Sequence, residues 1–232
     1  MFYLDLFAAL NRRVDYVLIG GLAISLHGIE RATMDIDVTV AMTPDNLSAL
    51  VEMARELGMT PVLPVALENL SDLDQLAQWH RERNLQAFAL RAPGLSGVTL
   101  DVLLYPPVDY AQIRGRAVTF LAGDIPVVGA SIDDLIALKQ IIGRPIDLAD
   151  IEQPQTLEGI LSMPFDRSNR TYHVSDDRLR VFRALSPEDK LRWVEQLATF
   201  LRLVQPAKGA AAGKAGLSHE TGSLNEWHGC QS

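Results

Sequence analysis

Cysteine is nearly absent from the sequence, which has only Cys230 among its 232 residues. A single cysteine cannot form a disulfide within the chain, and it cannot build a thiolate zinc site. The five histidines also lack a paired metal-ligand spacing such as H-E-x-x-H. These absences exclude a disulfide framework and a zinc motif of this kind, and they favour a reducing compartment.

Long apolar runs and an excess of positive charge are missing as well. The longest stretch without a charged residue, 16–29, is too short for a bilayer, which takes about 20 apolar residues. The arginines of MFYLDLFAALNRR follow the apolar stretch, whereas a secretory signal has its basic residues first. The formal net charge of -8 disfavours tight nonspecific nucleic-acid binding, which needs clustered Lys and Arg. We therefore expect a cytoplasmic protein with no membrane partner.

The composition is that of a globular protein, with 48% hydrophobic and 22% charged residues. Apolar periodicity and turn residues predict helices at 2–13, 22–29, 43–58, 71–83, 131–143 and 187–204, and strands at 16–21, 34–42, 85–92, 98–105, 118–123 and 125–129. The pattern predicts an α+β fold: an α+β core over 1–130 and a helical C-terminal part over 131–205. Residues 206–232, rich in Ala, Gly, Lys and Ser, are expected to form a disordered tail.

The acids Asp35 and Asp37 stand two apart on a predicted strand, so both side chains point to the same face. Taken alone, such a pair is more often a solvated strand face than a site. Asp101 changes this balance, because it stands among apolar residues in VTLDVLLY, where an uncompensated carboxylate is costly to bury. If the two strands are neighbours, the three carboxylates converge.

Converging carboxylates need compensation, because two of them about 4 Å apart repel by roughly 4 kcal/mol at an effective dielectric constant near 20. Hard oxygen ligands suit Mg²⁺ or Mn²⁺, and magnesium often takes its remaining ligands from substrate phosphates. Asp35, Asp37 and Asp101 are therefore candidate metal ligands. The alternative is that Asp101 forms an ion pair with an arginine such as Arg31.

Gly20 and Gly21 end a predicted strand and precede a short helix. Glycine lets backbone approach a ligand closely, and a helix N-terminus offers free N–H groups. The pair is a candidate phosphate cradle; the alternative is a tight strand–helix turn.

A second candidate group follows the core, where Lys139 lies on the predicted helix and Arg144 comes just after it. A lysine can neutralise triphosphate charge, although a solvated helix face would have the same composition. Asp147 and Asp150 fit a structural role at the start of a further helix.

The stretch IGGLAISLHGIERATMDIDVTV resembles the signature of the polymerase-beta-like nucleotidyltransferase superfamily, in which an apolar strand and Gly-Gly or Gly-Ser precede Asp-x-Asp. The resemblance is closer to the abortive-infection type nucleotidyltransferases, many of which are toxins of toxin–antitoxin pairs. The residues that match their two motifs are Gly20, Gly21, Ala23, Arg31, Thr33, Asp35 and Asp37, and then Lys139, Arg144, Asp147 and Asp150. The resemblance covers about residues 14–152.

This resemblance implies a mixed sheet with flanking helices and a two-metal active site. Asp35 and Asp37 would bind both metals, and Asp101 would be the third carboxylate, which helps to activate the acceptor hydroxyl. The triphosphate would be held by five other motif residues, which are Gly20, Gly21, Arg31, Lys139 and Arg144. Many superfamily members have a serine at the second motif position, so Gly21 leaves only backbone donors there.

The predicted activity is metal-dependent transfer of a nucleoside monophosphate from a nucleoside triphosphate to an acceptor hydroxyl. A tRNA, a protein or a small hydroxylated molecule would be a compatible acceptor, and an antitoxin is a possible partner. One alternative is a non-catalytic module that binds a nucleotide or a partner, such as an antitoxin-like regulator. The other is a structural α+β protein with surface acids.

Overall fold

The computed structural model describes residues 1–29, 33, 35–94, 98–142 and 183–207. Its helices are α1 Phe2–Arg13, α2 Gly20–Leu26, α3 Pro44–Glu56, the 3₁₀ helix η1 Leu67–Ser71, α4 Leu73–Arg83, α5 Tyr110–Gly115, α6 Ile132–Ile142 and α10 Pro187–Leu203. Its strands are β1 Tyr16–Ile19, β2 Asp35–Val40, β3 Thr60–Pro61, β4 Ala87–Arg91, β5 Thr99–Leu103, β6 Val118–Ala122, β7 Ile125–Gly129 and β8 Val204–Pro206.

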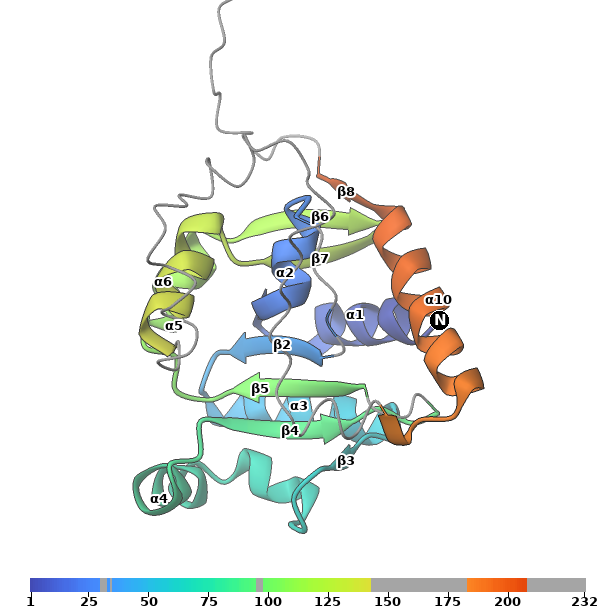
Figure 1. The fold of residues 1–232 in the computed structure, drawn as a ribbon. Helices are drawn as coiled ribbons and strands as arrows, with labels where there is room; N and C mark the ends of the chain where they lie inside the picture. Colours follow the sequence, from blue (N-terminus) through green and yellow to red (C-terminus); the bar gives the residue numbers. More distant parts are fainter. Residues whose placement is uncertain (30–32, 34, 95–97, 143–182, 208–232) are drawn as a thin grey trace, which may run out of the picture.

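The described strands form one eight-stranded mixed sheet in the order β3-β4-β5-β2-β1-β7-β6-β8. The pairs β2–β5 and β1–β7 are parallel, and the other neighbouring strands are antiparallel. Figure 1 shows helices on both sides of this sheet, and α10 contacts α1 and β6. The predicted fold class, an α+β mixed sheet flanked by helices, is confirmed.

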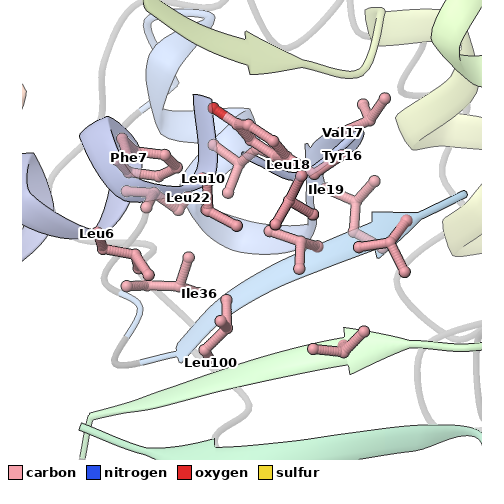
Figure 2. Packing of buried hydrophobic residues seen from close by; sticks show 14 of the residues in the cluster. Leu6, Phe7, Leu10, Tyr16, Val17, Leu18, Ile19, Leu22, Ile36 and Leu100 are labelled. Carbon is pink, nitrogen blue, oxygen red and sulfur yellow. The ribbon is translucent and has the colours of Figure 1, made fainter. Parts of the chain in front are cut away.

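The two faces of the sheet differ in chemistry because strand side chains alternate. On β2, Ile36 and Val38 point to one face and are fully buried, as are their partners Leu100 and Val102 on β5. Helix α1 packs on this apolar face; Figure 2 shows Leu6 beside Ile36. The opposite face of β2 and β5 carries the acids.

Helix α10 is attached to the core by aromatic packing. Its apolar residues recur at helical spacing, so Trp193, Leu197 and Phe200 share one buried face. The Phe200 ring stacks on Tyr3 and on Phe7, with centroid distances of 5.2 and 5.4 Å. Burial within this aromatic cluster raises the pKa of Tyr3 to about 12.

The helix termini follow the signals in the sequence. Thr43 accepts a hydrogen bond from Asn46 N at the start of α3, and Pro44 occupies its first turn. Ser186 caps α10 through Asp189 N in the same way. Both predicted helices are confirmed.

Several short elements differ from the sequence-based prediction. The predicted strand 16–21 ends at Ile19, and both glycines belong to α2. Helix α5 and strands β3 and β8 were not predicted. Pro206, assigned to the tail by composition, pairs with Phe120 of β6. Residues 208–232 lie outside the described ranges, and the division at 130 stays a prediction.

Among the described helices, none is both long and apolar enough to cross a membrane.

Replacing Phe200 with alanine tests whether α10 is part of the cooperative core. The change removes a ring that is completely buried between two other rings, so we expect the free energy of unfolding to fall by about 3–5 kcal/mol. Urea denaturation of the full chain measures it. The control is Leu191→Ala on the same helix, where a side chain that is 71% exposed should cost about 0.5 kcal/mol or less. Equal effects of the two changes would contradict the packing described for α10.

Candidate active site

The register between β2 and β5 brings two of the predicted acids together. Asp37 and Asp101 are direct partners in this parallel pair, and Figure 1 shows the two strands side by side. Partner residues point to the same face, and neighbouring strands lie about 4.8 Å apart. Both side chains are half-buried. Two residues separated by 64 positions in the chain are therefore neighbours on one face of the sheet.

Asp35 has a different environment from the other two acids. It is the first residue of β2 and is buried, with 6% of its surface exposed. Its strand partner is Thr99, whose Oγ1 donates a hydrogen bond to Asp35 Oδ1 at 2.9 Å. Thr99 was not singled out in the sequence; the signal for it is its place two residues before Asp101, on the same strand face. This hydrogen bond orients one oxygen of the buried carboxylate.

Gly20 lies directly against the carboxylate of Asp37. Ile19, the last residue of β1, is the partner of Asp37, so the next residue passes over that side chain. The backbone of Gly20 has φ +67°, in the left-handed region, where the chain leaves β1 and begins α2. Gly21 follows as a buried residue of α2. Asp37 is thus flanked by the glycine turn on one side and Asp101 on the other.

The pair of neighbouring carboxylates is compatible with a hard divalent cation. In the described ranges, no group of three or more His, Cys, Asp or Glu side chains is arranged to hold a metal ion. Magnesium, however, is usually bound through one or two carboxylates together with substrate phosphates and water. Asp37 and Asp101 supply two such oxygen donors on adjacent strands. The donor set therefore fits Mg²⁺ or Mn²⁺ held jointly by protein and a phosphate ligand.

Helix α6 is fixed at its N-terminus by a buried carboxylate. Asp134 is only 2% exposed, and it receives a bidentate ion pair from Arg116, with Nε to Oδ2 at 3.1 Å. Ser131 Oγ donates to Asp134 Oδ2 at 2.7 Å and accepts from Asp134 N at 3.2 Å, which caps the first turn. These contacts set where α6 begins relative to β7.

The remaining predicted site residues are placed only in part. Lys139 belongs to α6, but the position of its side chain is not among the described features. Arg31, Arg144, Asp147 and Asp150 lie outside the described residues. Their contacts with phosphate, and the alternative ion pair of Asp101 with Arg31, stay predictions.

His27 has a packing role at the end of α2. One ring nitrogen, Nε2, lies 2.9 Å from the carbonyl oxygen of Ala130, and the ring meets Phe120 edge-on at 5.0 Å. These contacts join the C-terminus of α2 to β7 and β6. The histidine therefore holds the helix that follows the glycine turn.

The pKa of Asp134 reflects opposing effects. Burial raises it, but the hydrogen bonds from Arg116 and Ser131 outweigh burial, so the pKa lies below the ordinary value of 3.8. Because the folded-state pKa is lowered, the ionised carboxylate stabilises the fold above the unfolded-state pKa. This contribution is lost as the pH falls through the folded-state value.

Comparison with known proteins gives one family. A family model described as "Nucleotidyltransferase of unknown function (DUF6036)" matches residues 3–178, which is more than half of the chain. The matched range contains both glycines, the three acids and α6. No curated protein matches the chain.

Replacing Asp134 with asparagine should destabilise the protein in a pH-dependent way. We expect the wild-type protein to have the higher Tm between about pH 5 and pH 7, where the carboxylate is ionised. The difference should shrink below about pH 4, where Asp134 takes up a proton in the unfolded state, and it should be lost as the pH falls through the lowered folded-state pKa. Thermal melts from pH 7 to pH 3 measure it.

The matched control is Asp133→Asn, since Asp133 is the exposed neighbour in the same helical turn. A Tm difference that stays constant down to pH 3, or one equal to that of the control, would contradict the structural role assigned to the Asp134 carboxylate.

Proposed function

Because the chain belongs to this family of nucleotidyltransferases, we propose that it transfers a nucleoside monophosphate from a nucleoside triphosphate to an acceptor hydroxyl, with release of pyrophosphate. The observation that carries the proposal is the direct pairing of Asp37 with Asp101 beside the turn at Gly20. Acids on adjacent strands, next to a backbone turn free of side chains, are the parts that metal-assisted phosphoryl chemistry needs.

The carboxylates of Asp37 and Asp101 would hold the divalent metal, with Asp35 completing the acidic face. When bound, Mg²⁺ or Mn²⁺ supplies positive charge to the triphosphate and to the reacting oxygens. The sheet contributes positioning, since both acids project from hydrogen-bonded central strands and are not on loops. Thr99 orients Asp35 from the same face through its 2.9 Å hydrogen bond.

Asp101 is suited to the acceptor side of the reaction. Its neighbour on β4 is Ala89, and Arg91, two residues further along the same face of β4, is exposed. A side chain as small as alanine beside the half-buried Asp101 carboxylate would allow an acceptor hydroxyl group to approach it. Asp101 would accept a hydrogen bond from that hydroxyl and orient its oxygen for in-line attack on the α-phosphorus.

The triphosphate would lie over the glycine turn. Gly21 offers only backbone donors, so the charge of the phosphates must be met by cations as well as by N–H groups. Lys139 on α6 is our candidate for this role, together with Arg31 and Arg144. The Arg116–Asp134 ion pair fixes the N-terminus of α6, the helix to which Lys139 belongs.

The resemblance to the abortive-infection type enzymes is the basis for proposing the acceptor and the biological role. We infer that the protein modifies a tRNA end, a protein side chain or a small hydroxylated molecule as the toxin of a toxin–antitoxin pair. An acidic chain can still act on an RNA end, because contact with an end needs little area.

The direct test offers each of the four α-labelled nucleoside triphosphates to the protein with Mg²⁺ or Mn²⁺. Total RNA and total protein serve as separate acceptors. We expect label in one fraction, and we expect Asp37→Asn and Asp101→Asn each to lower its rate of incorporation at least about 100-fold. The matched control is Asp124→Asn, an exposed acid in the β6–β7 turn, which should retain full activity.

The other outcomes of the labelling assay also distinguish the alternatives. Label in neither fraction directs the assay to small hydroxylated acceptors. Failure of those too, with metal-dependent nucleotide binding intact, would favour the non-catalytic binding module. Incorporation that survives both substitutions would reject the assigned acids.

A further inference from the structure

Gly20 occupies a position where the structure leaves no room for a side chain. A Cβ built on its backbone would lie 2.1 Å from Asp37 Oδ2, 2.7 Å from Asp37 Cγ and 2.9 Å from Asp37 Cβ. All three distances are shorter than contacts between real carbon and oxygen atoms of neighbouring residues. The carboxylate of Asp37 therefore fills the space that a side chain at position 20 would take.

Turning the Asp37 side chain would relieve only part of this overlap. Rotation about χ1 moves the carboxylate, but it leaves Asp37 Cβ in place, at 2.9 Å from the added atom. Relief of that contact requires a shift of the backbone of β1 or β2. These strands are paired through four residues and are buried in the core, so a shift is opposed on both sides.

We infer that Gly20 is a positioning residue for Asp37. Because Gly20 has no side chain, the carboxylate of Asp37 can lie directly against the glycine turn. This inference rests on the proposed function for its catalytic meaning. It gives Gly20 a different task from the close approach to phosphate expected from the sequence. The side of Gly20 that faces the sheet is occupied by Asp37, so the glycine places the carboxylate between the turn and Asp101.

Two effects of substitution at Gly20 must be separated, because φ +67° is also unfavourable for any residue with a Cβ. Gly123 provides a matched control. Its φ is +63°, and a Cβ there would meet nothing within 4 Å. Gly123→Ala thus measures the cost of the left-handed backbone alone, and Gly20→Ala measures that cost together with the overlap on Asp37.

The test is a thermal double-mutant cycle on the full chain without metal, joined to a titration with Mn²⁺. Gly123→Ala should lower the Tm by about 2–8 °C. Gly20→Ala should lower it further in the wild-type background, but no further than Gly123→Ala when Asp37 is replaced by glycine. If Gly20→Ala alone fails to fold, recovery of a folded protein in Gly20→Ala/Asp37→Gly gives the same answer.

The Mn²⁺ titration tests positioning apart from stability. Gly20→Ala should weaken Mn²⁺ binding about 10- to 100-fold, and Gly123→Ala should leave it unchanged. Wild-type Mn²⁺ affinity in Gly20→Ala, or an equal Tm loss with and without the Asp37 side chain, would overturn the inference. Absence of Mn²⁺ binding by the wild-type protein would instead reject the metal-dependent function, and the thermal cycle would still decide whether Gly20 and Asp37 are coupled.

Discussion

The parallel pairing of β2 with β5 is the constraint on which the candidate site depends. A slip of β5 by one residue against β2 would turn Asp101 to the opposite face and bring Leu100 to the acid face. The apolar residues of both strands prevent this, because each is completely buried when the register is correct. Hydrophobic packing on one face therefore aligns the charged groups on the other.

The pairing of β2 with β5 also brings like charges together, and this local free-energy cost is offset by packing elsewhere in the sheet. Two neighbouring carboxylates, with a third one buried at the start of β2, oppose folding where no cation compensates them. Natural folds accept such local conflicts mainly at functional positions. The aromatic packing of Tyr3, Phe7 and Phe200 contributes to the stability that offsets this cost.

Local patterns in the sequence predicted most elements, because alternation on β2 and the caps at Thr43 and Ser186 act within a few residues. They also placed Asp35 and Asp37 on one strand face. Local patterns could not predict the order of the strands. The partner of Asp37 comes 64 positions later in the chain, and pairing over that distance leaves no local signal. For the same reason neither the hydrogen bond of Thr99 nor the overlap between Gly20 and Asp37 could be predicted. Strands β3 and β8 are too short to carry a periodicity.

Those two short strands are also the outer strands of the sheet, and each one contains a proline, Pro61 in β3 and Pro206 in β8. Proline has no N–H to donate, and a strand of two or three residues offers few free backbone groups to another chain. Within the described residues, both borders of the sheet are thus poor templates for aggregation or for the addition of a foreign strand. A partner that met the described part of the sheet at either border would therefore bind through side chains and not by adding a strand.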